Sequence, residues 1–266
     1  MDPNDPGVQK VLREFPAADL PASSGIKIDA GRMVSLLREL AVNYQRLPFS
    51  NTAQPGLNYY YENPAFPCGD AIILGLMLLH YKPRKVIEVG SGFSSCVMID
   101  LNGEAYRTNP ADLTFVEPFP ETLLSLLAAG SPYRNKILAE RVQSVPLDDF
   151  GKLGENDILF IDSTHVSKMG SDVNYLIFNV LPILKPGVLI HIHDVFYPFE
   201  YPSEWIVNEN RSWNEAYLLR SFLQFNSAFK VIFWNHFAQR KFPAELEALA
   251  PLFMKSNNGS IWLRRR

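Results

Sequence analysis

The stretch Val86-Ile87-Glu88-Val89-Gly90-Ser91-Gly92-Phe93-Ser94-Ser95 decides the fold. Its apolar start predicts a short strand over 85–88, and the residues that follow predict a helix over 94–101. Two glycines one residue apart let the backbone turn sharply between the two and approach a ligand closely. The helix behind them points its free N–H groups at the turn. We therefore expect a strand–turn–helix unit whose turn faces a ligand.

Downstream segments continue this alternation of strands and helices. We predict strands at 113–117, 137–142, 158–162, 187–191, 230–234 and 260–263, and helices at 121–128, 172–184 and 213–225. Several of the strands are continuous apolar runs, which indicates a mostly parallel sheet with helices on both faces. The prediction is a doubly wound, Rossmann-like α/β fold of seven strands, the last of them antiparallel. Ligands then bind beyond the carboxyl ends of the strands.

The chain before this unit has a different character. Residues 1–29 are rich in Pro, Ala and Asp and predict an irregular arm, and a helical period begins at Asp29. The loop 48–67 carries clustered aromatic side chains, for which core packing is favoured over a ligand wall. A buried helix is expected over 70–81. We divide the chain into residues 1–67, an N-terminal helical cap of arm, helix and aromatic loop, and residues 68–266, the catalytic domain.

Composition limits the classes of function. The chain has 266 residues, 47% of them apolar, and a net charge of −3, so nucleic acid is not an expected partner. Its two cysteines, Cys68 and Cys96, exclude a disulfide framework and favour a reducing compartment. The most apolar stretch, 71–79, falls far short of the about 20 residues that span a bilayer. We expect a cytoplasmic protein with a small-molecule substrate and no membrane partner; a homodimer stays open.

Acids accompany the glycine turn and the next strand. Glu88 precedes the turn, where it would oppose a diphosphate but suit an ammonium group. Ser95 stands where a dinucleotide fingerprint would need a third glycine. Glu117 ends the second strand, where a carboxylate can accept both hydroxyls of a ribose. These features point to a nucleoside ligand other than NAD.

This order of residues resembles the class I S-adenosylmethionine-dependent methyltransferases. Across Val86–Phe196 it is most similar to small-molecule methyltransferases whose fourth strand ends in Asp-Ser-x-His and whose fifth ends in His-Asp. The resemblance implies S-adenosylmethionine as the cofactor. Its methionine portion would lie at the glycine turn, its ribose at Glu117 and its adenine near Gln143 and Ser144. The cofactor-binding residues that it implies are Glu88, Gly90, Ser91, Gly92, Ser94, Ser95, Glu117, Gln143, Ser144 and Asp162.

Acids and histidines gather after the fourth and fifth strands, at Asp162, His165, His193 and Asp194. One interpretation is a metal site of Asp162, His165 and Asp194 that takes Mg²⁺ or Mn²⁺ and lowers the pKa of a substrate oxygen. The other is a general base, His165 or His193, oriented by the acids. Val195 weakens the metal interpretation, because related metal-using enzymes usually place a third oxygen ligand there. His191 is expected to be a core residue.

We therefore expect methyl transfer from S-adenosylmethionine to an oxygen of a small metabolite, with a nitrogen as the second choice. Asp162, His165, His193 and Asp194 are the candidate catalytic residues. The aromatic connection 196–214 is expected either to line the acceptor site or to pack in the core. Two rivals remain, a nucleotide-dependent oxidoreductase and a catalytically inactive cofactor-binding module. Ser95 and Glu88 count against the first rival, and the Asp/His cluster counts against the second.

Overall fold

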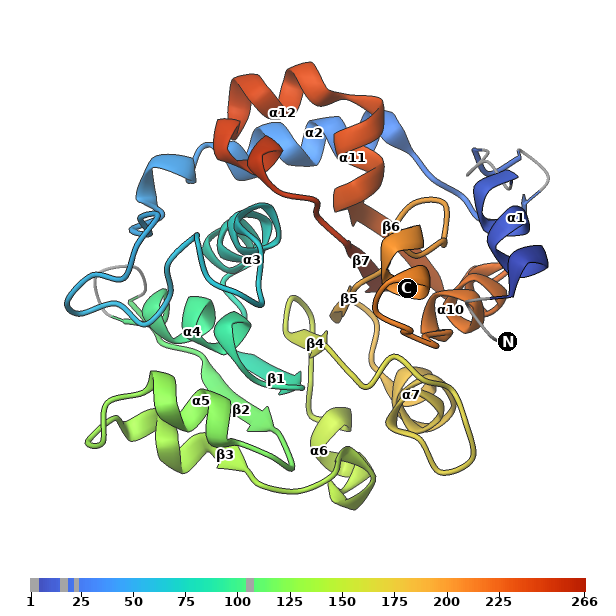
Figure 1. Cartoon of the computed structure of the whole chain (residues 1–266). Coiled ribbons are helices and arrows are strands. Elements are labelled where there is room, and N and C mark those ends of the chain that lie inside the picture. The colour runs from blue at the N-terminus through green and yellow to red at the C-terminus, as the bar shows by residue number, and fades with distance from the viewer. Residues whose placement is uncertain (1–4, 15–18, 22–23, 104–107) are drawn as a thin grey trace.

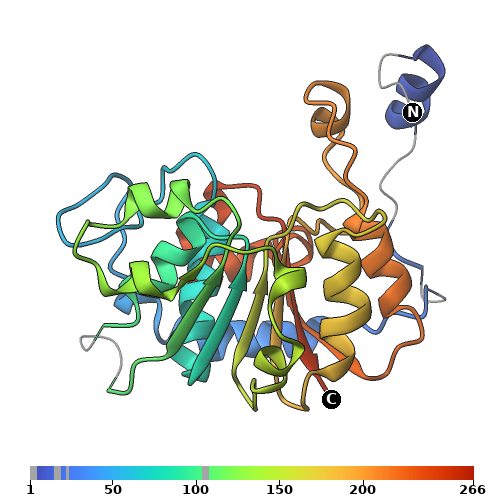
Figure 2. The same ribbon diagram turned by 90° about the horizontal axis from the view of Figure 1, so that it is seen from below.

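The computed structural model describes residues 5–14, 19–21, 24–103 and 108–266, and a seven-stranded sheet forms its centre (Figures 1 and 2). The strands are β1 Lys85–Val89, β2 Asp112–Val116, β3 Ile137–Leu138, β4 Ile158–Ile161, β5 Leu189–His193, β6 Phe229–Trp234 and β7 Ser260–Arg265. The central strands β4 and β5 are buried throughout, as expected for a sheet covered on both faces, and β4 is a continuous apolar run.

The strand order is β3-β2-β1-β4-β5-β7-β6, which is the order of the class I methyltransferase fold. The first five strands of this order pair in parallel. Strand β7 runs antiparallel to both β5 and β6, as predicted for the last strand. The chain runs outward from β1 to β3 and then returns to β4 on the other side of β1. This switch between β1 and β4 is where a doubly wound sheet binds its ligand.

Helices cover both faces of the sheet (Figure 1). One layer holds α2 to α5 together with α11 and α12, and the other holds α6, α7 and α10. A π-helical turn, Leu176–Val180, joins α7 to α8. The helices are α1 Pro6–Glu14, α2 Ala30–Ala41, α3 Cys68–Tyr81, α4 Phe93–Asp100, α5 Glu121–Leu126, α6 Leu147–Gly151, α7 Asp172–Tyr175, α8 Leu181–Ile183, α9 Ser203–Val207, α10 Glu215–Leu223, α11 Asn235–Lys241 and α12 Pro243–Leu249.

Most of the aromatic loop before α3 packs in the core, as predicted. Tyr59, Tyr61 and Phe66 are buried, and Tyr59 lies edge-to-face with both of the others. The Tyr59 hydroxyl donates to the Phe66 carbonyl at 3.0 Å, so its polar end is satisfied inside the protein. His191 is also a core residue: it is fully buried and stacks on Phe160 at 3.9 Å between ring centroids.

Two predicted strands were wrong in their bounds. The strand expected at 137–142 stops at Leu138, where the chain turns and Glu140 N–H donates back to the Leu138 carbonyl. The strand expected at 187–191 runs from Leu189 to His193 instead. Gly187 has a φ of +92° and belongs to the turn before the strand, not to the strand. His193 is therefore the last residue of β5.

The N-terminal arm is not wholly irregular, because α1 occupies Pro6–Glu14. The Asp5 carboxylate accepts from the N–H groups of Gly7 and Val8, and Pro6 stands at the first helical position. Those local signals outweigh the proline-rich composition. Other parts of the predicted arm, 1–4, 15–18 and 22–23, lie outside the described residues. Asp29 caps α2 by accepting from Arg32 N–H, so that helix begins where it was predicted.

Helix α2 packs against α3, α12 and β6, so it belongs to one helix layer of the sheet. The boundary between residues 67 and 68 stays a prediction. Within the described parts of the chain, we find no helix long and apolar enough to cross a bilayer.

Candidate functional site

The glycine turn after β1 sits directly on the backbone that follows β4. Gly90 has a φ of +84°, and its N–H donates to the Val116 carbonyl at 3.0 Å. A Cβ atom at this position would lie 1.7 Å from the Asp162 carbonyl oxygen. Asp162 N–H in turn donates to the Val89 carbonyl at 2.8 Å. Only glycine allows this close approach, which ties the turn to the first residue of the predicted catalytic cluster.

Glu88 lies in β1, just before the turn. It is fully buried, and its carboxylate accepts from the Ser94 hydroxyl at 2.6 Å and from the Ser95 hydroxyl. Burial raises the pKa of this carboxyl to about 8, although the two hydroxyl donors oppose the shift. Ser95 Oγ also accepts from Gly92 N–H at 3.1 Å. Glu88 therefore orders the turn through the first residues of α4, and its contact with a ligand ammonium stays a prediction.

A pocket of about 450 Å³ opens beyond the carboxyl ends of β1, β2 and β4. It brings together Gly90, Glu117, Gln143 and Asp162 from four separate segments. Six other predicted residues do not line it, namely Glu88, Ser91, Gly92, Ser94, Ser95 and Ser144. The pocket lies at the switch point of the sheet, the expected place for a nucleoside ligand.

Two backbone donors orient the Glu117 carboxylate. Ser91 N–H donates to its Oε2 at 3.1 Å, and Phe119 N–H donates to its Oε1 at 2.8 Å. Each carboxylate oxygen has a second acceptor position that these bonds leave unused. Glu117 is therefore held at the pocket wall with acceptor capacity on both oxygens, as ribose binding would require.

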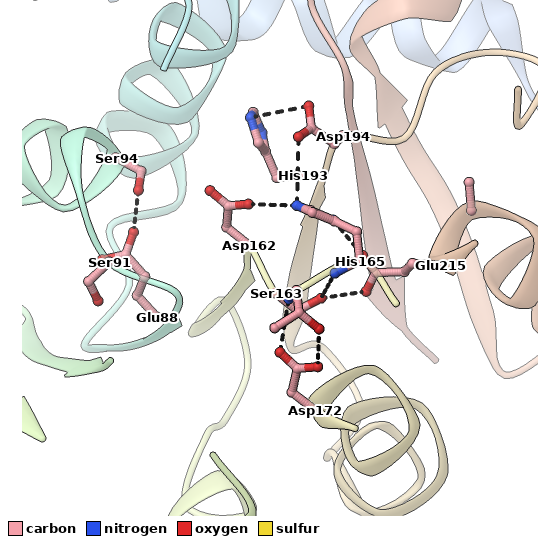
Figure 3. A network of polar contacts seen from close by, with 12 residues as sticks. Glu88, Ser91, Ser94, Asp162, Ser163, His165, Asp172, His193, Asp194 and Glu215 are labelled. Carbon is pink, nitrogen blue, oxygen red and sulfur yellow. Dashed lines mark hydrogen bonds and ion pairs between the residues drawn. The ribbon is translucent and has the colours of Figure 1, made fainter. Parts of the chain in front are cut away.

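The Asp/His cluster is assembled as predicted in space (Figure 3). His165 Nε2 lies 3.3 Å from Asp162 Oδ1 and 3.6 Å from Asp194 Oδ2. One ligand atom from each of these three residues lies within 4.8 Å of those of the other two. His193 Nε2 is 3.7 Å from Asp194 Oδ1. All four residues lie at the carboxyl ends of β4 and β5, and Asp162 also lines the pocket.

The backbone at the cluster is unusual. His165 and Asp194 have φ values of +59° and +54°, a conformation that few residues other than glycine adopt. Asp172, at the start of α7, holds the loop before His165 by accepting from the Thr164 N–H at 2.9 Å and from its hydroxyl at 2.6 Å. Conformations of this kind persist where surrounding contacts over-determine them, and they concentrate at functional sites.

Charge and burial act against each other on the pKa values of the cluster. Burial raises the pKa of Asp194 to about 6, against the effect of the two histidines. Burial acts to lower the pKa of His165, but its hydrogen bonds to Asp162 and Glu215 raise that pKa well above the usual value. The pKa of His193 is also raised despite burial, because Asp194, Asp162 and Asp70 surround it. The cluster is an acid-rich site that favours a cation or a proton.

Glu215 and Asp70 were not among the residues predicted from the sequence. Glu215, at the start of α10, accepts from Ser163 Oγ at 3.1 Å and lies 2.9 Å from His165 Nδ1. Asp70 is fully buried in α3 and accepts from Asn235 and Ser260 side chains, both at 2.6 Å. An acid at a helix start is common for local reasons. Nothing in the neighbouring sequence distinguishes Glu215 or Asp70 from an ordinary acid at a helix start, because their partners lie far away in the sequence.

The aromatic connection 196–214 divides between core and site. Phe199 is fully buried, whereas Trp205 and Trp213 are half-buried. The guanidinium of Arg211 lies over both indoles, 4.3 and 4.5 Å from their centroids. The Trp213 ring lies 4.2 Å from the His165 ring. Figure 2 shows this connection, with α9, rising above the carboxyl ends of the strands. Part of it therefore stands beside the cluster.

Comparisons with known proteins agree with this geometry. Residues 87–195 match the family model described as a methyltransferase domain. An uncharacterized protein of Archaeoglobus fulgidus is 35% identical over 101 residues, which are 38% of this chain and 44% of that protein. The matched part therefore spans less than half of that relative's length.

Two solved structures are similar over most of their length. The O-methyltransferase TomG from Streptomyces achromogenes, in complex with SAM, is 15% identical, with coverage of 90% of this chain and 91% of that chain and a TM-score of 0.45. The O-methyltransferase from Bacillus cereus, in complex with SAH, is 13% identical, with coverage of 97% and 96% and a TM-score of 0.41. The family match and the strand order carry the assignment: residues 87–195 match a methyltransferase domain and lie in a sheet of the class I order.

Proposed function

We propose that this chain transfers the methyl group of S-adenosylmethionine to an oxygen of a small molecule, and that Asp162, His165 and Asp194 hold a divalent cation at the acceptor. One observation carries the proposal. Asp162 belongs both to the pocket at the switch point and to the polar triad with His165 and Asp194, so the two sites adjoin. A methyl donor in the pocket and an acceptor at the triad would meet at Asp162.

The pocket offers what the cofactor needs. Glu117 presents both carboxylate oxygens for ribose hydroxyls, and Gln143 lies on the wall reached through β3. Gly90 brings backbone, without a side chain, to the point nearest Asp162. We assign the ribose to Glu117, the adenine to the side of Gln143, and the methionine portion to the glycine turn.

The triad has the composition of a divalent cation site. It provides two carboxylates and one imidazole, a donor set suited to Mn²⁺ and, with water, to Mg²⁺. Glu215 occupies the Nδ1 side of His165, so Nε2 faces Asp162 and Asp194. A neutral imidazole would direct its lone pair toward the two carboxylates there, so a divalent cation between them would be bound by all three residues. When bound, such a cation lowers the pKa of an acceptor oxygen.

The reaction itself is a displacement at carbon. The acceptor oxygen forms a bond to the methyl carbon while the carbon–sulfur bond breaks, and S-adenosylhomocysteine leaves. The proton of the acceptor hydroxyl passes to a base, for which we assign His193, whose Nε2 lies 3.7 Å from Asp194 Oδ1. Holding the oxygen close to the methyl group supplies much of the acceleration in such reactions.

Cofactor binding tests the proposal first. S-adenosylhomocysteine is expected to bind with micromolar affinity, about −8 kcal/mol, and to raise the melting temperature. NAD and NADP at the same concentration are expected to leave it unchanged. Calorimetry and thermal shift measure both effects. Stabilisation by NAD alone would support the oxidoreductase rival and overturn the proposed function.

Glu117 provides the second test. Glu117→Ala is expected to weaken S-adenosylhomocysteine binding by about 1.5–3 kcal/mol, the range for hydrogen bonds to a charged group. The melting temperature without ligand is expected to change little, because the side chain is only half-buried. Glu121→Ala, an exposed acid in the first turn of α5, is the matched control. An unchanged dissociation constant in Glu117→Ala would show that this carboxylate does not bind the ribose.

A further inference from the structure

We propose that Glu215 is a positioning residue for the cluster. It fixes the ring hydrogen of His165 on Nδ1 and holds the ring so that Nε2 faces Asp162 and Asp194. The role of this arrangement in catalysis rests on the proposed function, whereas the orientation of the His165 ring is independent of that proposal. Glu215 lies in α10, 50 residues after His165 in the chain, and outside the predicted catalytic residues.

Both carboxylate oxygens of Glu215 are committed to one short segment after β4. Oε2 lies 2.9 Å from His165 Nδ1, and Oε1 accepts from Ser163 Oγ at 3.1 Å. The side chain is only 2% exposed, so water does not compete for these bonds. Figure 3 shows Glu215 on the side of the imidazole opposite to the two aspartates. The buried carboxylate therefore has two partners in the segment whose geometry matters for the cluster.

The backbone joins the same two segments at further points. The His165 carbonyl accepts from the N–H groups of Asn214 and Glu215 at 3.0 and 3.1 Å. Asn214 Oδ1 accepts from Ser167 N–H at 2.6 Å. Trp213 covers the His165 ring at 4.2 Å. These contacts hold His165 in its left-handed conformation, and they place the Glu215 carboxylate beside Nδ1, whereas Nε2 of the same ring faces the aspartates.

The physical consequence concerns the imidazole hydrogen. A carboxylate accepts and does not donate, so Nδ1 must carry a hydrogen to bond with Glu215. In the neutral ring, Nε2 then has the free lone pair, and it points at the aspartate pair. Metal-binding histidines commonly have a carboxylate on the other nitrogen, which sets the tautomer and raises the basicity of the ring. Glu215 occupies that place for His165.

The experiment compares Glu215→Ala and Glu215→Gln with the wild-type chain. Mn²⁺ affinity is measured by calorimetry, and the tautomer of His165 by ¹⁵N spectra of histidine-labelled protein at a pH where the ring is neutral. Glu215→Ala is expected to lower Mn²⁺ affinity about 10–100-fold and to lose the Nδ1–H tautomer. Glu215→Gln should lose less of both, because its amide oxygen still accepts from Nδ1. The matched control is Glu200→Gln, since Glu200 lies in the connection before α10 and accepts a hydrogen bond from the Tyr217 hydroxyl, away from His165.

Folding and cofactor binding are checked in the same variants. The affinity for S-adenosylhomocysteine should be kept, since Glu215 does not line the pocket. If Glu215→Ala does not fold, the isosteric Glu215→Gln decides. An unchanged tautomer and unchanged Mn²⁺ affinity in both variants would overturn the positioning role. If the wild-type chain binds no Mn²⁺, the metal part of the proposed function fails, and the tautomer alone still decides the role of Glu215.

Discussion

Asp194→Ala and His165→Ala are each expected to lower turnover by about 10²–10⁴ while S-adenosylhomocysteine affinity stays nearly intact. The two residues lie in the cluster after β4 and β5, and neither lines the pocket. The loss therefore falls on the chemical step. Turnover is measured by the release of S-adenosylhomocysteine, and affinity by calorimetry. Asp148→Ala, an exposed acid in the first turn of α6, should behave as wild type.

A chelator separates the two chemical roles of the cluster. With a metal at Asp162, His165 and Asp194, a chelator should abolish wild-type activity, and added Mg²⁺ or Mn²⁺ should restore it. Activity that is indifferent to the chelator would instead support a histidine acting as general base without a metal. Full activity in both Asp194→Ala and His165→Ala would show that the cluster takes no part in catalysis.

Gly90→Ala is expected to destabilise the fold by about 2–4 kcal/mol and to abolish cofactor binding. The added methyl group would lie 1.7 Å from the Asp162 carbonyl oxygen, and the φ of +84° is unfavourable for alanine. The turn and the loop after β4 must move apart to relieve the clash. Thermal unfolding should show a melting temperature about 5–15 °C lower, given the size of the chain.

Gly92→Ala is the matched control for stability. A Cβ at Gly92 meets only the Thr122 methyl group, at 4.0 Å, and its φ of −174° is extended backbone. Its melting temperature should therefore stay near the wild-type value. If Gly90→Ala has the same melting temperature as Gly92→Ala, the contact between the turn and Asp162 is not tight. The close approach of Gly90 would then not link the pocket to the cluster.

The sequence predicted the part of the fold that is built from short, local signals. The apolar runs at β1, β2 and β4 stand beside glycine or proline turns and were placed within one or two residues of their observed bounds. Strand β3 was predicted too long, because apolar residues such as Val142 continue beyond the point where the chain leaves the sheet. Periodicity reports burial, and a buried turn has the same pattern as a buried strand.

The helices α11 and α12 were not predicted. Asn235–Lys241 and Pro243–Leu249 are short and are separated by Phe242 alone, so neither has the length that makes a helical period stand out. Their stability comes from packing against α2 and α3. Tertiary packing outweighs local propensity in such short helices.

The candidate site divides in the same way. The four cluster residues lie at or just after strand ends and were found from the rule that ligands bind there. Glu215 was missed because it reaches the cluster from α10 through its side chain, and no spacing in the sequence marks that contact. Glu88 was correctly placed at the turn, but its burial beneath Ser94 and Ser95 depends on how α4 packs.

The position of β7 in the sheet affects the order in which the protein can be assembled. Strand β7 lies between β5 and β6, and β6 has no other sheet partner among the described strands. During synthesis, β5, which ends in His193, therefore waits with one edge unpaired until residues 260–265 are made. Unpaired edges invite wrong pairing between chains. The buried Asp70 likewise lacks its Gly259 and Ser260 donors until then. The half of the sheet that carries the histidines is thus the last part to become a closed structure.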